Sequence, residues 1–265
     1  MTQPLSFAEF VGKPFIQAAV QNPMTPESVL SFFFGVNLQD PESIETGLRQ
    51  GHCLQAMNDL WWKGFPEYDQ LCQSTFTEAI RAAGKGTFLL NESMQTAQPL
   101  TTSRIDDYMS EIILCDQLSR NCFRGSLEAF AYDPVALQRA RQVADLFLSN
   151  DGNSHADGEI YLPYTVFLNT AFMHSESLDD HATILKVMEK VEAMSPPQFA
   201  NMWKIQRQMA LDHSQVIERF GRYPHRNFVN GRTNTPEEDM WLKDVENLPM
   251  WAKSQMAAAA SEKTK

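Results

Sequence analysis

The sequence lacks most of the short patterns that identify a class of protein. It has no CxxC pair, no HExxH, no glycine-rich phosphate loop, no Rossmann fingerprint and no GxSxG elbow. Its four cysteines are scattered, so we expect reduced, partly buried thiols rather than a disulfide or zinc framework. With these signatures excluded, we predict neither a bound metal nor a cofactor.

Positive charge is also scarce, since 22 lysines and arginines stand against 33 aspartates and glutamates. The net charge of −11 disfavours nucleic acids and anionic membranes as partners, because both would repel the chain. The longest apolar runs are far shorter than the roughly 20 residues that cross a bilayer. The N-terminus has no basic stretch followed by an apolar one, so we expect a soluble, cytoplasmic protein, with organelle targeting left open.

Strand signals are nearly absent, whereas helical signals are frequent. No segment sustains an alternation of apolar and polar residues, and no Asn-Gly or Asp-Gly pair joins two β-branched runs. Capping residues, prolines in first turns and apolar residues three or four apart indicate helices instead. The predicted helices are at about 25–35, 67–83, 101–120, 133–150, 162–173, 178–194, 199–220 and 235–242.

This pattern predicts an all-α fold, a single-domain stack of antiparallel helices. An apolar share of 43% is enough for one large core, and no linker rich in proline, glycine or serine divides the chain. We therefore expect an N-terminal extension at 1–24, one helical domain at 25–252 and a disordered tail at 253–265. The mixed polarity of residues 39–57 indicates an insertion or a long loop.

A first group of candidate site residues lies on the helix predicted at 101–120. Asp116 continues the apolar stripe of this helix at spacings of three and four residues. A carboxylate on a buried face needs a charged or hydrogen-bonding partner. Arg120, one turn further on, is the local candidate, and the arginines at 222–226 are the distant ones. Asp116 and Gln117 either tie helices together or form part of a site; surface exposure is a third alternative.

The second group is the basic segment 213–232, which holds four arginines and one glutamate and is formally +3 in an otherwise acidic chain. Gly221 suits a helix end with positive φ, so we expect a turn after it. Three basic side chains would project from that turn: Arg222, His225 and Arg226. Guanidinium groups on a turn suit bidentate binding of a phosphate or carboxylate. Alternatively, they form a structural ion network with Asp116 and Glu176.

Two histidines and a glutamate complete the candidates. His174 and Glu176 follow the most apolar of the predicted helices, and His213 lies on the apolar face of the helix at 199–220. A histidine at either position is commonly held by a hydrogen bond, which is the simpler interpretation of both. The scattered histidines and a glutamate could in principle bind a metal ion, but their spacing matches no known ligand pair.

Polar and aromatic motifs in chain order give the sequence a resemblance to a known family. The first half of the pattern is Phe32-Phe33-Phe34-Gly35, Trp61-Trp62, Asp116-Gln117-Leu118-Ser119-Arg120-Asn121, Phe123-Arg124-Gly125 and Ala129-Phe130-Ala131 with Asp133. The second half is Met173-His174-Ser175-Glu176, the segment from Arg219 to Asn227, Gly231-Arg232 and Thr235-Pro236-Glu237-Glu238. Over roughly 29–242 the chain resembles the family catalogued as domain of unknown function 924.

The resemblance implies an all-α fold similar to a tetratricopeptide-like superhelix, and it implies that the shared polar motifs meet in one pocket. The resemblance does not imply a function. Leu118 and Ser119 depart from the usual family pattern, and the segment 36–60 is longer than usual. The candidate ligand-binding residues are Asp116, Gln117, Arg120, Asn121, Arg124, His174, Glu176, His213, Arg222, His225 and Arg226.

Three hypotheses about function follow. In the first, the arginines hold a small anionic molecule that bears a phosphate or carboxylate, with catalysis left open and Asp116, His174, Glu176 or His225 moving protons. In the second, a non-enzymatic tetratricopeptide-like module binds a protein or an acidic peptide. In the third, the motifs are a structural ion network. The sequence defines neither the reaction nor the oligomeric state.

Overall fold

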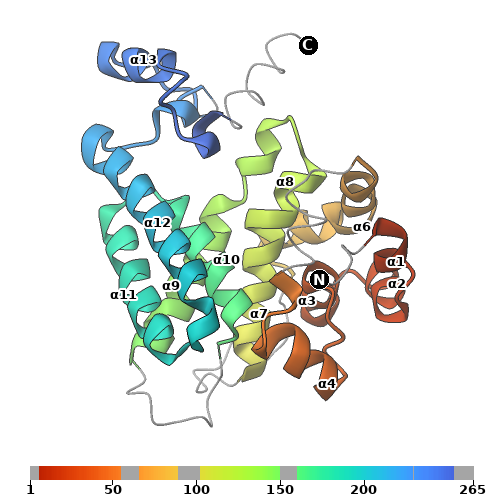
Figure 1. The fold of residues 1–265 in the computed structure, drawn as a ribbon. Helices are drawn as coiled ribbons and strands as arrows, with labels where there is room; N and C mark the ends of the chain where they lie inside the picture. The colour runs from red at the N-terminus through yellow and green to blue at the C-terminus, as the bar shows by residue number, and fades with distance from the viewer. Residues whose placement is uncertain (1–5, 55–65, 89–101, 150–159, 229, 254–265) are drawn as a thin grey trace.

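The computed structural model describes residues 6–54, 66–88, 102–149, 160–228 and 230–253. Within these ranges the chain forms helices joined by loops and contains no strand, which confirms the all-α prediction (Figure 1). The elements are α1 (Phe7–Val11), α2 (Pro14–Gln21), α3 (Pro26–Phe34), α4 (Pro41–Ile44), η1 (Glu45–Arg49), α6 (Pro66–Gly84), α7 (Thr102–Ile112), η3 (Ile113–Leu118), α8 (Ser119–Cys122), η4 (Leu127–Phe130), α9 (Asp133–Ser149), α10 (Leu162–Met173), α11 (Leu178–Met194), η5 (Pro197–Phe199), α12 (Ala200–Phe220), η6 (Pro224–Arg226) and α13 (Pro236–Lys243). The tetratricopeptide-like superhelix stays a prediction.

The helix boundaries follow capping signals in the sequence. Thr25 accepts a hydrogen bond from the backbone N–H of Ser28 at the start of α3, and Thr235 and Glu238 form a reciprocal capping box at the start of α13. Gly221 has a φ of 68°, which favours glycine and ends α12. All eight predicted helices are present, although the segment predicted at 101–120 is divided into α7, the π-helical turn η3 and α8.

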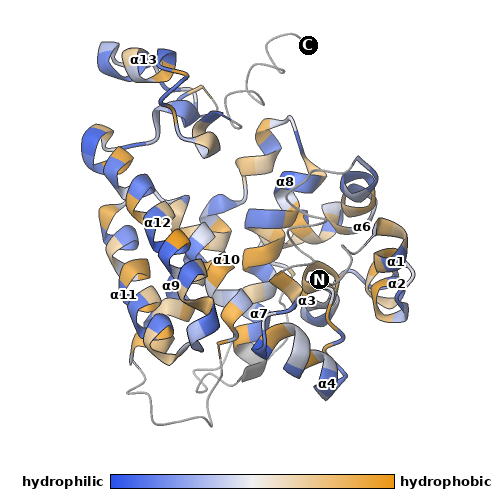
Figure 2. Cartoon of the chain, in the orientation of Figure 1, coloured by the Kyte–Doolittle hydropathy of each residue, from blue (hydrophilic) through white to orange (hydrophobic). Residues whose placement is uncertain are grey.

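The centre of the molecule is α10, of whose 12 residues 11 are buried. It packs against α7, α9, α11 and α12, while α7 also contacts α3. Figure 1 shows α9 to α12 gathered on one side of α7 and the N-terminal helices on the other. In Figure 2 the outer helices α11 and α12 carry both hydrophilic and hydrophobic residues, as expected for helices with one face in the core. No helix within the described ranges has the length and apolar character needed to cross a membrane.

The C-terminal part of the described chain forms a small cap with its own core. Val216, Ile217 and Tyr223 are buried there, and Trp241 and Trp251 pack against them. Figure 1 shows α13 beyond the end of α12, away from the main helices. The turn η6 lies between this cap and the main core, so residues on η6 can reach the end of α10.

The predicted N-terminal extension at 1–24 includes α1 and α2. Phe10 and Ile16 are buried in the main core, where the ring of Phe10 lies edge-on to that of Phe32 with centroids 5.4 Å apart. Trp61-Trp62 and the predicted tail, apart from Lys253, lie outside the described residues.

The interpretation of 39–57 as a long loop is wrong for its described part, whereas the alternative of an insertion stays a prediction. Asp40 caps α4, and α4 runs directly into the π-helical turn η1. Leu48 is fully buried in the main core, and Gly47 lies against Val36. The sequence pattern misses these elements because together they are shorter than the window of about 11 residues in which a helical period can be recognised.

Gly47→Ala should destabilise the protein, although alanine ordinarily favours a helix. A Cβ atom at position 47 would lie 2.4 Å from Cγ2 of Val36, a side chain that is 3% exposed. We expect the free energy of unfolding to fall by about 1–3 kcal/mol in a denaturant titration. Because Val36→Ala removes the clashing methyl group, Gly47→Ala should cost less in that background. An equal cost in both backgrounds would contradict the prediction.

Candidate functional site

Asp116 lies in the π-helical turn η3 and is 0% exposed, as its place on the apolar stripe predicts. Its Oδ1 accepts a short hydrogen bond from Nδ1 of His174, the residue that ends α10. Its Oδ2 accepts a hydrogen bond of 2.6 Å from the side-chain amide of Gln117. Nη2 of Arg120 lies 3.7 Å from Oδ1. Asp116 is therefore buried beside the imidazole ring of His174 and the guanidinium group of Arg120.

The surroundings of Asp116 keep its carboxylate ionised. Burial alone would raise the pKa of Asp116, but the imidazole of His174, the charge of Arg120 and the hydrogen bonds from His174 and Gln117 outweigh burial and lower this pKa below its usual range. An ionised Asp116 accepts the hydrogen on Nδ1 of His174, which leaves Nε2 as the ring nitrogen that can take up a proton. This is how a carboxylate orients a histidine base in enzymes.

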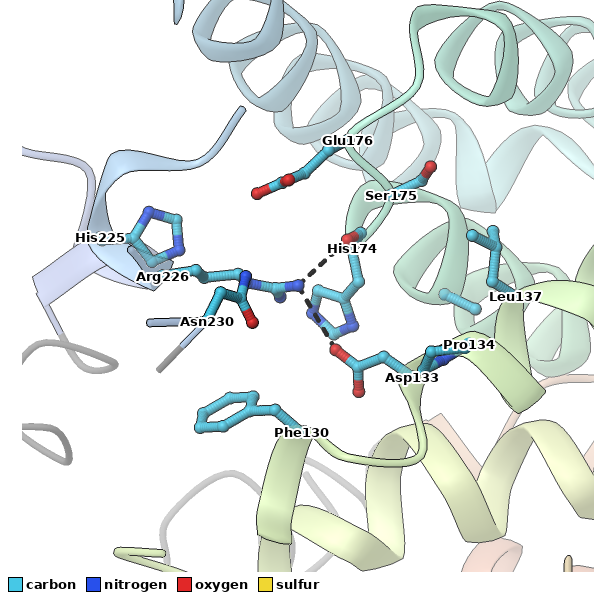
Figure 3. Close-up of a pocket in the computed structure, with 11 residues that line it drawn as sticks. Phe130, Asp133, Pro134, Leu137, His174, Ser175, Glu176, His225, Arg226 and Asn230 are labelled. Atoms are coloured by element: carbon cyan, nitrogen blue, oxygen red, sulfur yellow. Dashed lines mark hydrogen bonds and ion pairs between the residues drawn. The ribbon is translucent and has the colours of Figure 1, made fainter. Parts of the chain in front are cut away.

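Asp133, the first residue of α9, joins two arginines beside this pair. Its Oδ1 accepts a hydrogen bond of 2.7 Å from Nη2 of Arg120, and its Oδ2 accepts one of 3.3 Å from Nη1 of Arg226. Nη1 of Arg226 also donates to the carbonyl of His174 at 3.0 Å (Figure 3). The sequence indicates Asp133 as the start of a helix and as part of the family pattern, but Asp133 is not among the predicted site residues, because aspartate is common at the start of a helix.

A cavity of about 280 Å³ adjoins these residues. Phe130, Pro134 and Leu137 lie on its apolar side. Its polar lining includes Asp133, His174, Glu176, His225, Arg226 and Asn230. Figure 3 shows the guanidinium group of Arg226 between Phe130 and Glu176, directed toward His174. The volume is close to the lower end of the range for ligand pockets, about 300 Å³.

Glu176 is held as an anion at the edge of this cavity. Both of its carboxylate oxygens accept hydrogen bonds from Arg232, at 2.6 and 2.7 Å, and the backbone N–H of Tyr223 donates to Oε1 at 2.9 Å. Burial would raise the pKa of Glu176, but these hydrogen bonds and the nearby arginines lower it. Glu176 is paired as the ion-network hypothesis predicts, although with Arg232 rather than with an arginine of the 222–226 turn.

Three of the predicted site residues lie in other clusters. Asn121 donates to Oδ1 of Asp69 at 2.8 Å, and Arg124 donates to both oxygens of Asp69 at 2.5 and 3.0 Å, so these two residues tie α8 and the turn after it to α6. Arg222 binds both oxygens of Glu238 at 2.6 and 2.8 Å, away from the cavity. The prediction of one pocket for all the polar motifs is therefore wrong for these three.

Comparison with known proteins assigns the chain to a family. Residues 29–246 match the family model described as a bacterial protein of unknown function, DUF924. The chain belongs to this family. The solved structure of a protein of unknown function, ATU0120 from Agrobacterium tumefaciens, is similar at a TM-score of 0.50 and 23% identity, over 72% of this chain and 92% of that chain. This likeness shows the fold alone. No curated protein matches the chain.

The two remaining candidate histidines of this DUF924 protein are His213, on α12, and His225, which precedes Arg226 on the turn η6. Nδ1 of His213 donates to the carbonyl of Met209 at 2.7 Å, and its ring stacks on Trp251 with centroids 4.0 Å apart. Burial lowers the pKa of His213 to about 3. His225 lines the cavity, and its ring centroid is 5.1 Å from that of Trp251. His213 is thus held by a hydrogen bond, as its simpler interpretation predicts.

Three residues of the DUF924 site have the spacing of metal ligands. Asp116, Asp133 and His174 each place one ligand atom within 4.8 Å of the other two. However, the guanidinium group of Arg120 lies within 3.7 Å of both carboxylates, so a cation between them would meet an existing positive charge. The charge of Arg120 therefore disfavours a metal ion between these three residues.

Proposed function

We propose that this protein binds a small anionic molecule in the cavity and that His174 acts there as a general base. The observation that carries the proposal is the pair formed by Asp116 and His174. A buried carboxylate holds Nδ1 of a histidine that lines a cavity, which leaves Nε2 to accept a proton from a ligand or a water molecule. A histidine with only a structural role needs no such cavity beside it.

Arg226 supports the anionic character of the ligand. Its side chain is 11% exposed, and it is held in place by Asp133 and by the carbonyl of His174. A guanidinium group fixed in this way needs little reordering when an anionic oxygen binds beside it. It can also stabilise negative charge that develops on a ligand when His174 removes a proton.

The size of the cavity favours this hypothesis over the peptide-binding one. A volume of about 280 Å³ suits a small metabolite, whereas a peptide in an extended groove contacts a far longer surface. The ion pairs of Arg222 and Arg232 support the structural hypothesis for those two arginines. The ligand site and the ion network thus use different arginines of the basic segment.

Asn230→Asp should weaken the binding of an anionic ligand and leave the fold intact. Asn230 is exposed and lines the cavity, so an aspartate there would repel the anion and compete for Arg226. The measurement is thermal unfolding with a panel of phosphorylated and carboxylated metabolites. A ligand at 100 times its Kd stabilises the wild type by about 2.7 kcal/mol, and we expect Asn230→Asp to lose most of that gain.

Asn201→Asp provides the matched control. It makes the same charge change at an exposed position in the first turn of α12, and it should keep the ligand effect of the wild type. Two results would contradict the proposed function. One is that no anionic compound stabilises the wild type. The other is that the two aspartate variants respond equally to every compound that does.

A further inference from the structure

Among the described side chains, and with His174 and His225 neutral, the charges around the cavity balance. Three acidic and three basic side chains either line it or pair directly with those that do: Asp116, Asp133, Glu176, Arg120, Arg226 and Arg232. A phosphate monoester would bring two further negative charges next to Asp133 and Glu176, whose arginine partners in the described part of the chain are already paired with these carboxylates. A ligand whose own charges sum to zero leaves the balance unchanged. The electrostatics therefore favour a zwitterion.

Glu176 and Arg226 are neighbouring groups of opposite charge on the cavity wall, and Asp133 pairs with Arg226 at 3.3 Å. In Figure 3 the carboxylate of Glu176 lies on one side of the Arg226 guanidinium and Phe130 on the other. An ammonium group beside Glu176 and a carboxylate beside Arg226 would both meet groups of opposite charge. Glu176 and Arg226 both line this one small cavity and lie next to each other in Figure 3, so an ammonium and a carboxylate on one carbon atom could face both residues.

The helix ends give an independent reason for the same polarity. The cavity lies between the first turn of α9, which contributes Asp133, Pro134 and Leu137, and the last turn of α10, which contributes Ala171 and ends at His174. The start of a helix carries partial positive charge and its end carries partial negative charge. The end of α10 therefore favours the ammonium group of a ligand, whereas the start of α9 already holds the carboxylate of Asp133, which is paired with Arg120 and Arg226.

The apolar side chains of the cavity wall indicate the polarity and size of the ligand's own side chain. Phe130, Pro134, Leu137 and Ala171 offer apolar surface, and the volume of about 280 Å³ leaves room for a small side chain only. We infer that the cavity binds a small zwitterion of the α-amino acid class with an apolar side chain. This inference rests on the proposed function, because it names the class of ligand for the same site.

Four probes test this inference by calorimetric titration of the full chain. L-Leucine carries both charges, 4-methylpentanoate keeps the carboxylate alone, 3-methylbutylamine keeps the ammonium alone, and inorganic phosphate is the dianion. We expect leucine to bind at least tenfold more tightly than each of the other three. Leu137→Phe, which narrows the apolar wall, should shift the preference from leucine toward alanine.

The outcomes separate this inference from the proposed function. If 4-methylpentanoate binds as tightly as leucine, or if phosphate binds more tightly, the amino acid class is wrong and the anion site stands. If neither these probes nor any other anionic compound stabilises the wild type, the anion site itself is wrong. Preferential binding of 3-methylbutylamine would overturn both, because it would mean that Glu176 and not Arg226 selects the ligand.

Discussion

Asp116→Ala should lower the free energy of unfolding by about 3–5 kcal/mol. The carboxylate of Asp116 is fully buried, and its removal leaves His174, Arg120 and Gln117 without their shared acceptor. Breaking one side of a buried ion pair costs this much because the remaining charge keeps its desolvation penalty and loses its compensation. The measurement is a denaturant titration of wild type and variant at pH 7. Equal m-values would show that both proteins expose the same amount of surface on unfolding.

Asp145→Ala is the matched control for this prediction. Asp145 lies on α9 with an exposed side chain, so the same substitution there should change stability by no more than about 0.5 kcal/mol. Asp116→Asn keeps the shape of the side chain and should cost less than the alanine variant. If Asp116→Ala lowers the free energy of unfolding by less than about 1 kcal/mol, the partners of Asp116 form hydrogen bonds with water or with other acceptors in the variant. Asp116 then has no large structural role.

The tautomer of His174 separates the structural role of Asp116 from its role in the proposed chemistry. In the wild type, neutral His174 should carry its hydrogen on Nδ1, because that nitrogen donates to Asp116. In Asp116→Asn the amide can present either a donor or an acceptor, so the preference should weaken. Nitrogen chemical shifts of the imidazole ring report this directly, in a variant that stays folded.

Much of the fold can be predicted from the sequence because its signals are local. Thr25 and Thr235 are capping residues that act within one turn, and Gly221 ends α12 through its own φ. The burial of Asp116 is also a local inference, since it depends only on the spacing of apolar residues along one helix. These features need no knowledge of which helices pack together.

The candidate site is harder to predict because its contacts join distant segments. Arg226 binds Asp133, 93 residues away, and Arg232 binds Glu176, 56 residues away. Charge alone allows any arginine of the basic segment to pair with any buried carboxylate, and only the tertiary arrangement selects among them. For the same reason, no local pattern shows that Asn121 and Arg124 share Asp69 instead of reaching the cavity.

His213 should make stability depend on pH between about 6.5 and 4.5. Burial lowers the pKa of His213 to about 3 in the folded protein, against 6.5 as its ordinary value. The unfolded chain therefore binds a proton as the pH falls below 6.5, and the folded chain does not. The stabilising effect is fully present above pH 6.5 and decreases as the pH falls. At about 1.4 kcal/mol per pH unit, the loss by pH 4.5 is about 2–3 kcal/mol.

The comparison of wild type with His213→Gln isolates this contribution from other groups that titrate in the same range. Burial also lowers the pKa of His181, and it raises the pKa of Asp106 to about 6, which acts in the opposite direction. The contributions of His181 and Asp106 are present in both proteins, so they cancel when the free energy of unfolding of His213→Gln is subtracted from that of the wild type. The groups around His213 are the Met209 carbonyl and the rings of Tyr223 and Trp251, with the positive charges of His174, His181 and Arg226 opposing its protonation.

His213→Gln keeps a donor for the Met209 carbonyl but loses the stacked ring, so it should be less stable than wild type at pH 7.5. Because glutamine does not titrate, the difference in the free energy of unfolding should shrink as the pH falls and should have changed by about 2–3 kcal/mol at pH 4.5. Unfolding titrations at several pH values measure it. A difference that stays constant with pH would mean that folded His213 binds its proton as readily as the unfolded chain does.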